Sequence, residues 1–355
     1  MKILLITDLY PVKQSEKYTP KTVYDFAAEW KNLGHEVKVI KPNFILNSFL
    51  RGKPYYKNGV YGDVENVNYW LPFIGNIDNK LKNTNFDEYD YIIAHMPSGI
   101  IFANRLRELL NLSVPFIAAV HVSDLEVLTK PLYSIYFKSG MERAYAKAAK
   151  IACRSEVLRR KFLKIFPEYE EKTFVAYSGI NSECIVKRQW KPGNKVKIMT
   201  CANMKKRKNI DKVILACNSI KNTELTVVGD GYEYKNLKKL GGENVIFTGH
   251  LPNDSVLNTM RQSDIFILPS ENETFGMVYL EAMASGCITV GLKGDGIDGI
   301  IKHGENGYLC TKDNIKSLLE EIINSNNQNL ILENCCNTIN SCTKENAALN
   351  YLNHL

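Results

Sequence analysis

The chain has 355 residues, of which 45% are hydrophobic and 23% are charged, a composition typical of globular proteins. The length predicts about two domains. No apolar run approaches the roughly 18 residues that span a bilayer. Residues 1–11 lack the apolar core and cleavage site of a signal peptide. We therefore expect a cytoplasmic protein.

The net charge of +7 is unevenly distributed along the chain. Residues 1–176 carry 25 basic and 19 acidic side chains, which gives +6, whereas residues 177–355 carry 20 and 19, which gives +1. Residues 130–165 hold ten basic and two acidic residues, interleaved with aromatic ones. Either these cations form a solvated face, or they contact anionic lipid headgroups at the inner face of the cell membrane. Nucleic acid is disfavoured as a partner because no recognition motif accompanies the charge.

Nine cysteines are scattered through the chain, and none belongs to a Cys-x-x-Cys pair. Cysteines in this pattern are mostly small buried hydrophobic residues in a reducing compartment. The sequence therefore predicts reduced thiols and no structural zinc.

The first half alternates apolar, β-rich runs with helical patterns. A helix is predicted at residues 20–33, and strands are predicted at 2–8, 35–42, 89–96, 114–121, 150–155 and 173–179. Near-continuous apolar strands separated by helices indicate a parallel sheet that is covered on both faces.

The second half repeats this scheme after a polar stretch at residues 178–195, which contains Pro192-Gly193. Its strands are predicted at 195–203, 224–231, 244–250, 264–270 and 287–292. We predict two doubly wound α/β domains, residues 1–177 and 178–340, that face each other across a cleft. Ligands of such sheets bind at the carboxyl ends of the strands, so functional residues should directly follow strands.

The segment "PSENETFGMVYLEAMASG" (269–286) follows a predicted strand and leads into a helix. One interpretation of its two glutamates is purely structural: they are solvated residues at the start of a helix, where their negative charge is favourable. They also have a functional one, because a helix N-terminus binds anions through its free amides. Glu273 can accept hydrogen bonds from sugar hydroxyls, and Glu281 can accept them from a vicinal diol such as ribose. This arrangement is typical of a nucleotide-sugar pocket.

The pattern Ser270-x-x-Glu273-x-Phe275-Gly276, followed by residues 280–286, resembles the signature of retaining glycosyltransferases of family four. The stretch 294–309 resembles the continuation of that signature. The resemblance covers most of the chain and implies the GT-B fold, with two Rossmann-like domains. It also implies that the C-terminal helix, predicted at 341–355, crosses back onto the first domain.

Roles in the second domain follow from the resemblance. It implies that Glu273 binds the donor sugar and that Glu281 binds the ribose. It also implies that the amides of Phe275 and Gly276 lie by the diphosphate and the donor sugar, and Met277 is expected among the donor-binding residues. The segment "ANMKKRKNIDKVI" (202–214) resembles the diphosphate-binding turn, and its matching lysine is Lys208. A lysine there neutralises the charge that grows on the leaving diphosphate.

One position departs from the family pattern, because Asn203 stands where the family usually has arginine. Either Arg207 supplies the second positive charge, or Lys208 carries the stabilisation alone. Two further turns are expected beside the nucleotide, and their residues are Gly229, Gly231, Gly249, His250 and Leu251.

In the first domain, His121 ends a predicted strand and resembles the histidine that the family places beside the donor sugar. Asp124 either orients a ligand hydroxyl or caps the next helix. His95 is a weaker candidate. The first loop lacks the family's Gly-Gly pair, and its acceptor-side candidates are Lys13, Lys17, Thr19 and Lys21.

The resemblance predicts a retaining glycosyltransferase that acts on a glycan or lipid-linked acceptor in bacterial surface polysaccharide or glycoconjugate assembly. We expect no cofactor besides the nucleotide-sugar donor, and a UDP-sugar in preference to a GDP-sugar. The chain has no Asp-x-Asp pair of the kind that holds a metal-bound diphosphate, so metal-independent transfer is predicted. Two alternatives stay open: a sugar-nucleotide epimerase or phosphorylase on the same fold, and a non-catalytic glycosyltransferase-like subunit.

Overall fold

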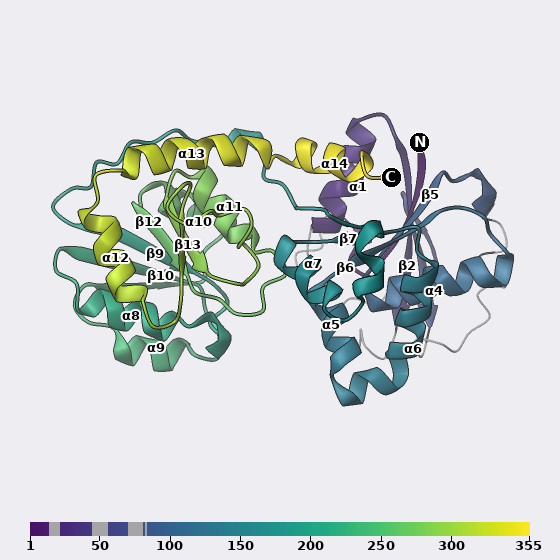
Figure 1. Cartoon of the computed structure of the whole chain (residues 1–355), viewed down its shortest axis with the longest axis horizontal. Helices are drawn as coiled ribbons and strands as arrows, with labels where there is room; N and C mark the ends of the chain where they lie inside the picture. Colours follow the sequence, from purple (N-terminus) through teal and green to yellow (C-terminus); the bar gives the residue numbers. More distant parts are fainter. Residues whose placement is uncertain (14–21, 45–55, 70–80, 82–83) are drawn as a thin grey trace. The chain divides into compact units, whose positions relative to one another are not determined.

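The structure is a computed structural model that describes residues 1–13, 22–44, 56–69, 81 and 84–355. These residues form two compact units. Unit 1 contains residues 1–154, 158–176 and 347–355, and unit 2 contains residues 155–157 and 177–346. Each unit is an α/β layer structure in which helices flank a central sheet (Figure 1), and the α/β class predicted from the sequence is confirmed.

Among the residues that the structure describes, the sheet of unit 1 has eight strands in the order β3-β4-β2-β1-β5-β6-β7-β8. All neighbouring strands are parallel except β3 and β4, which form an antiparallel pair that the sequence patterns did not predict. The strands are β1 (Lys2–Ile6), β2 (Glu36–Phe44), β3 (Gly59–Tyr61), β4 (Val64–Tyr69), β5 (Tyr91–His95), β6 (Phe116–Val120), β7 (Lys150–Cys153) and β8 (Thr173–Val175).

Both faces of this sheet are buried because successive side chains of a strand point to opposite sides. In β1, Ile3 and Leu5 join one hydrophobic cluster and Leu4 and Ile6 join the other. Helices cover each cluster, as the continuous apolar strands indicated. The helices are α1 (Thr22–Asn32), α4 (Met96–Leu110), α5 (Val122–Thr129), α6 (Pro131–Lys147) and α7 (Glu156–Leu163).

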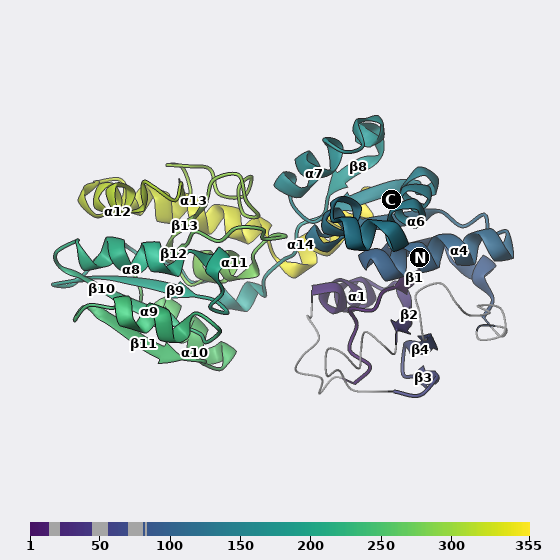
Figure 2. The same ribbon diagram turned by 90° about the horizontal axis from the view of Figure 1, so that it is seen from below.

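The sheet of unit 2 has six parallel strands in the order β11-β10-β9-β12-β13-β14. The strands are β9 (Val196–Cys201), β10 (Thr223–Val228), β11 (Val245–Gly249), β12 (Ile265–Leu268), β13 (Ile288–Leu292) and β14 (Tyr308–Cys310). Figure 2 shows the same succession of strands from β11 to β13. The helices are α8 (Ile210–Asn218), α9 (Tyr234–Leu240), α10 (Asn253–Arg261), α11 (Met277–Ala284), α12 (Ile315–Asn324) and α13 (Gln328–Ser341).

The strand order of unit 2 corresponds to the doubly wound arrangement of dinucleotide-binding folds. The order reverses between β9 and β12, and the loops that leave the carboxyl ends of these two strands begin at residues 202 and 269. In unit 1 the corresponding reversal lies between β1 and β5. Ligands of this fold bind beside such switch points, so these edges are where functional side chains are expected.

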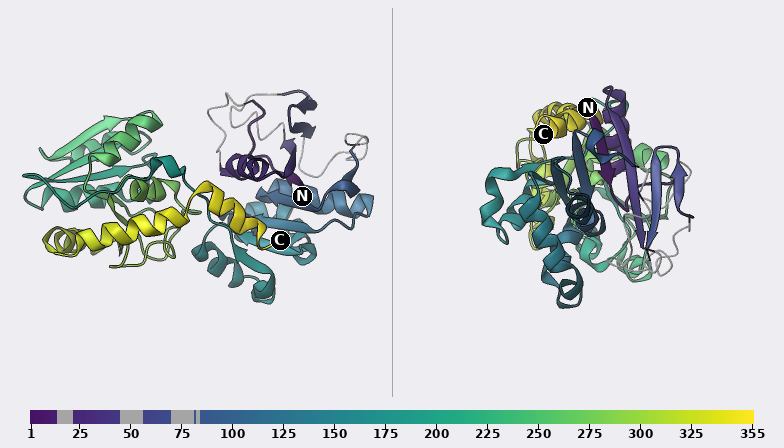
Figure 3. Two further views of the ribbon diagram at one scale, coloured as in Figure 1. Left: turned by 90° about the horizontal axis from the view of Figure 1, so that it is seen from above. Right: turned by 90° about the vertical axis from the view of Figure 1, so that its right-hand side faces the viewer.

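The C-terminal residues pack into unit 1 through α14 (Lys344–Leu352). Tyr351 is fully buried. The centroid of its ring lies 5.4 Å from that of Phe26, 5.2 Å from that of Trp30 and 5.4 Å from that of Phe174. The Tyr91 hydroxyl donates a hydrogen bond to the carbonyl of Leu355 at 3.0 Å. Both chain ends therefore lie on the same unit (Figure 3).

The basic block at residues 130–165 folds into α6, β7 and α7, and its cations have different surroundings. Lys130 pairs with Glu126 at 3.0 Å, and Arg154 is 1% exposed. No helix among the described residues is long and apolar enough to cross a membrane. The expected lipid contact of this block stays a prediction.

Candidate functional site

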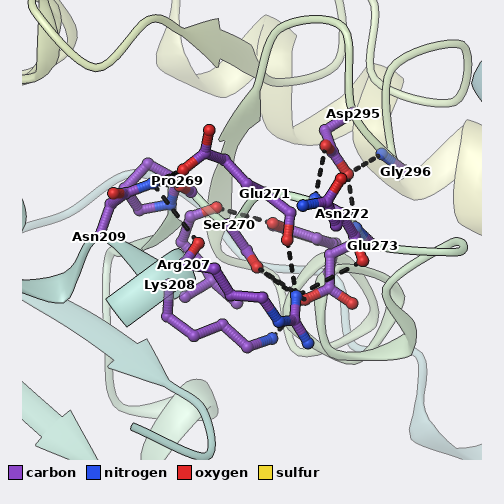
Figure 4. A network of polar contacts seen from close by, with 12 residues as sticks. Arg207, Lys208, Asn209, Pro269, Ser270, Glu271, Asn272, Glu273, Asp295 and Gly296 are labelled. Carbon is purple, nitrogen blue, oxygen red and sulfur yellow. Dashed lines mark hydrogen bonds and ion pairs between the residues drawn. The ribbon is translucent and has the colours of Figure 1, made fainter. Parts of the chain in front are cut away.

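The loops after β9 and β12 are joined by a network of polar contacts in unit 2 (Figure 4). A short 3₁₀ turn, η4 (Lys206–Lys208), lies in the first of these loops. The Arg207 guanidinium donates to the carbonyl of Glu271 at 2.6 Å, and the Asn209 amide donates to the carbonyl of Pro269 at 2.8 Å. These contacts join the two segments that the sequence analysis identified as candidate ligand-binding loops.

Glu273 is at the centre of this network, and its carboxylate contacts two positively charged side chains. Lys208 Nζ forms an ion pair with Glu273 Oε1, Arg207 Nη1 lies 3.2 Å from the same oxygen, and Ser270 Oγ donates to it at 2.7 Å. Burial by itself raises the pKa of Glu273. The charge and hydrogen bond of Lys208, the hydrogen bond of Ser270 and the charge of Arg207 outweigh burial and lower that pKa. Glu273 is therefore an ionised hydrogen-bond acceptor.

Asp295 fixes the backbone of the same loop, and the sequence patterns did not identify it. It is 7% exposed and accepts backbone N–H groups from Asn272 at 2.8 Å, Glu273 at 2.7 Å and Gly296 at 2.8 Å. Asn272 adopts a left-handed conformation, with φ of 57°. Two amides of the loop are thereby occupied inside the protein and are not available to a ligand.

The amides that remain for an anion belong to the start of α11. Gly276 directly precedes this helix with φ of 90°, and a Cβ at this position would lie 2.5 Å from the Tyr279 ring. The first N–H groups of a helix have no partner within it. Phe275 is 3% exposed, so this residue offers its backbone and not its ring. The local geometry suits the negative oxygens of a phosphate group.

A pocket of about 790 Å³ opens at the carboxyl ends of β9 and β10. Its lining includes the predicted residues Asn203, Gly229, Gly231, His250 and Leu251, together with Cys201, Ala202, Val228, Asp230, Tyr232 and Val256. A Cβ on Gly229 would lie 2.0 Å from the carbonyl oxygen of Ala202, so only glycine fits there. The additional lining residues share no sequence signal beyond their position next to predicted strand ends.

Glu281 lies close enough to this pocket for its charge to act on Cys201. Burial raises the pKa of Cys201 to about 11, and the charge of Glu281 contributes further to that increase, whereas the charge of Lys208 opposes it. The pKa of Glu281 itself is raised by burial. Because Asn203 of the pocket lining and Lys208 of the Glu273 network lie in the same loop after β9, we assign the pocket and the network to one candidate site.

In unit 1, His121 follows β6 and is partly exposed, while His95 ends β5 and is fully buried. Asp124 is also fully buried, and it accepts the backbone N–H of His121 at 2.6 Å. Of the two roles that the sequence allowed for Asp124, helix capping is the one that these contacts show.

The acceptor-side candidates of the first loop are only partly described. Lys13 is exposed, with its ammonium 5.9 Å from the centre of the Tyr56 ring. Lys17, Thr19 and Lys21 lie outside the described residues. Within the described segments, no group of three or more His, Cys, Asp or Glu side chains is arranged to hold a metal ion.

Two family models match consecutive parts of the chain. Residues 20–183 match the description "Glycosyltransferase Family 4", and residues 182–337 match "Glycosyl transferases group 1". Together the two matches extend from residue 20 to residue 337.

Curated relatives resemble the chain at moderate identity. A glycosyltransferase of Methanocaldococcus jannaschii is 27% identical over 60% of this chain and 59% of its own length. The N-acetyl-alpha-D-glucosaminyl L-malate synthase of Bacillus anthracis is 26% identical over 68% of this chain and 65% of its own length. The chain thus aligns with about three fifths to two thirds of these two proteins.

Solved structures extend the likeness to the whole chain. Anabaena HepE in complex with UDP matches with a TM-score of 0.72 at 17% identity, and the match covers 99% of this chain and 99% of HepE. The lipopolysaccharide outer core galactosyltransferase WaaB has a TM-score of 0.73 at 15% identity, with 100% of this chain and 99% of WaaB covered. At these identities the likeness establishes the fold.

Proposed function

Because this chain belongs to the glycosyl transferases group 1 and glycosyltransferase family 4, we propose that it is a retaining glycosyltransferase with a nucleotide-sugar donor. The sugar passes from a nucleotide diphosphate to an acceptor hydroxyl. The observation that carries the proposal is the cluster of Lys208, Arg207 and Glu273 beside the pocket of unit 2.

Each member of this cluster has a role in the proposed reaction. Lys208 and Arg207 supply positive charge where negative charge develops on the leaving diphosphate. Arg207 takes the place of the cation that Asn203 does not provide. Glu273, kept ionised by these cations, accepts hydrogen bonds from the donor sugar, and Glu281 accepts them from the ribose. The amides of Phe275, Gly276 and Met277 hold the diphosphate.

In the proposed mechanism the acceptor hydroxyl attacks the anomeric carbon on the face from which the diphosphate departs. The bond to the diphosphate breaks as the new glycosidic bond forms, and the leaving phosphate oxygen takes the acceptor's proton. No side chain of the protein acts as the nucleophile, and we propose that transfer needs no metal ion. His121 of unit 1 is the candidate contact to the donor sugar.

For the acceptor we propose a membrane-bound glycan intermediate of surface polysaccharide or glycoconjugate assembly. The name of WaaB, a lipopolysaccharide galactosyltransferase, and the basic block at residues 130–165 support this choice. A small soluble acceptor is the alternative, and the malate in the name of the Bacillus anthracis relative supports it. For the donor we propose a UDP-sugar, because HepE is a complex with UDP.

A thermal-shift panel tests the donor first. A ligand at about 100 times its Kd stabilises the folded state by about 2.7 kcal/mol. UDP-sugars should raise the melting temperature more than GDP-sugars do. If no nucleotide shifts it, the donor pocket is wrongly assigned. A new nucleotide sugar formed without acceptor would indicate the epimerase, and binding without any turnover would indicate the non-catalytic subunit.

Substitution of Lys208 tests the catalytic assignment. The Lys208→Ala variant should lose about 10²–10³ in kcat, the range seen when one electrostatic contact to a transition state is removed. The matched control is Lys206→Ala, because Lys206 lies in the same turn but is exposed and should leave kcat unchanged. Release of UDP with acceptor present measures both. Equal rates for Lys208→Ala and the parent would contradict the mechanism.

A further inference from the structure

An aromatic contact joins the loop after β12 to the segment at which unit 2 begins. The ring centroids of Tyr177 and Phe275 lie 5.4 Å apart, and the ring planes are inclined by 32°. Phe275 is 3% exposed, whereas Tyr177 is partly buried and packs against the core of unit 2. Phe275 is followed by Gly276 and α11, where the proposed diphosphate contacts begin. Tyr177 therefore supports the first residue of the proposed phosphate site.

The backbone that follows Tyr177 is fixed by contacts within unit 2. The N–H of Ile180 donates to the carbonyl of Cys342 at 2.9 Å. A Cβ on Gly179 would lie 2.2 Å from the carbonyl oxygen of Thr343, so only glycine fits at this position. These contacts hold the segment that carries Tyr177 against the segment that follows α13. The Tyr177 ring is thus attached to a backbone that has little freedom to move.

Phe275 is held in its place by packing. Asp295 accepts the N–H groups of Asn272 and Glu273, which fixes the first part of the loop. Among the described residues, the N–H of Phe275 donates no hydrogen bond, so the contacts of its ring have to hold its backbone. Of the aromatic rings that the structure describes, Tyr177 is the one that contacts Phe275. The two ends of the loop are therefore held in different ways, by a carboxylate and by an aromatic pair.

We propose that Tyr177 is a positioning residue for donor binding, because its ring holds Phe275 and thereby fixes the amides at the start of α11. The identity of the ligand rests on the proposed function, in which these amides bind the diphosphate. Amides that already have the geometry of the bound state bind an anion without the cost of ordering the loop. Loss of the ring lets the loop adopt several geometries, and the affinity for the diphosphate falls.

Tyr177 lies outside both loops of the candidate site. It is the first residue of unit 2 after Ala176, which belongs to unit 1. The N–H of Ala176 donates to the carbonyl of Cys153 in β7 at 2.8 Å. The affinity for the donor thus depends on a residue at the point where the chain passes from unit 1 to unit 2.

Binding of UDP and of uridine to the full-length protein separates the diphosphate contacts from the pocket. Uridine lacks the diphosphate, and the pocket lining does not include Tyr177 or Phe275. Tyr177→Ala should raise the Kd of UDP about tenfold, the upper end of what an aromatic pair contributes, and leave the Kd of uridine unchanged. Tyr177→Phe keeps the ring and should bind both ligands as the parent does. If Tyr177→Phe loses as much UDP affinity as Tyr177→Ala, the ring contact is not responsible and the proposal fails.

Ile185→Ala is the matched control for loss of packing in the same part of the chain. Ile185 is also partly buried, precedes β9 and packs against the core of unit 2. The N–H of the next residue, Val186, donates to the carbonyl of Ala284 at 2.7 Å, at the opposite end of α11 from Gly276. Ile185→Ala should therefore leave the Kd of UDP unchanged. An equal rise in Ile185→Ala and Tyr177→Ala would contradict the positioning role.

Hydrogen exchange tests the positioning of the loop without any ligand. The backbone amides between residues 272 and 281 include those that donate to Asp295 and those of the first turn of α11. They should exchange faster in Tyr177→Ala than in the parent, because the loop opens more often, and at the parental rate in Tyr177→Phe and Ile185→Ala. Mass spectrometry of peptides from this region measures the rates. Unchanged exchange in Tyr177→Ala would overturn the proposal.

The outcomes distinguish failure of this role from failure of the proposed function. If neither UDP nor uridine binds to the parent, the donor assignment fails, and hydrogen exchange still decides whether Tyr177 positions the loop. If UDP binds equally well to the parent and to Tyr177→Ala, the donor assignment stands and the positioning role is wrong. Should Tyr177→Ala fail to fold, Tyr177→Leu takes its place, and parental UDP affinity in that variant would refute the role of the ring.

Discussion

Glu273 and Glu281 are carboxylates of one segment, yet the protein gives them opposite electrostatic environments. The cations and the hydroxyl around Glu273 outweigh its burial and lower its pKa, whereas burial alone raises the pKa of Glu281. Glu273 is thus ionised at any pH near neutrality. Glu281 is held in a place where its charge costs folding free energy, and the ribose hydroxyls of a nucleotide would offset that cost.

Glu281→Gln should weaken UDP binding, by about tenfold or about 1.4 kcal/mol, because a charged acceptor is replaced by a neutral one. The pH dependence provides a sharper readout. As the pH falls through the raised pKa of Glu281, the carboxyl group gains a proton and loses acceptor capacity, so the parent should bind UDP more weakly. Calorimetric titration across this range should show no such decline in the variant.

Glu273→Gln provides the contrast to Glu281→Gln. It removes the partner of Lys208 and Arg207 and should mainly lower kcat, with UDP affinity close to that of the parent. Glu281→Gln should in turn unfold at no lower temperature than the parent, since it removes a buried charge. If UDP binds both variants as it binds the parent, the Glu281 assignment is wrong.

At the scale of elements, the site consists of loops that leave parallel strands. The loop after β12 is shaped by Asp295, which lies beyond the next strand and accepts three backbone N–H groups. Hydrogen bonds to a charged group contribute about 1.5–3 kcal/mol each, so this carboxylate has a large influence on loop geometry.

Asp295→Asn should lower kcat, because its amide group cannot accept the N–H of Asn272 while its oxygen keeps the contact to Glu273. Asp295→Ala should lower kcat further. UDP affinity should fall as well, because the loop that Asp295 fixes leads directly into the amides that we propose hold the diphosphate. The matched control is Asp298→Asn, because Asp298 accepts the N–H of Gly294 at 2.7 Å and not that of Glu273. Similar kcat values for Asp295→Ala and the control would contradict this role.

The strand predictions show which elements the sequence pattern can reveal. Strands such as β1 and β12 are continuous apolar runs because both faces of their sheets are buried, and they were predicted within a few residues. The pair β3 and β4 and the short β14 were not predicted. Val60 of β3 is 63% exposed, so the edge of the sheet lacks the apolar signal, and three-residue strands are too short to show a period.

At the scale of the whole molecule, the last residues of the chain complete the core of unit 1. The carbonyl of Ala348 accepts the indole N–H of Trp30 at 3.3 Å, across 318 positions of sequence. Tyr351 fills the space between Phe26, Trp30 and Phe174. Contacts of this range make the stability of unit 1 dependent on residues that follow unit 2 in the chain.

Tyr351→Ala should destabilise unit 1 by about 3–5 kcal/mol, the range for removing a large buried aromatic side chain. UDP should still bind, because the pocket lies in unit 2. Leu349→Ala is the control, since Leu349 is on the same helix but 38% exposed. Urea unfolding followed at several wavelengths measures the effect. A Tyr351→Ala protein as stable as the parent would show that the C-terminal segment packs on unit 1 without contributing to its stability.

The sequence by itself predicted the α/β class and the family, which are confirmed, because buried parallel strands leave local patterns. The roles that it predicts for Glu273, Glu281, Lys208 and His121 stay predictions. Tertiary structure alone decided which of these residues meet. Arg207 joins Lys208 on Glu273 across more than sixty positions, Asp295 closes the loop from beyond β13, and His95 reaches His121 from the neighbouring strand. Such pairings depend on strand order and register, which no local pattern encodes.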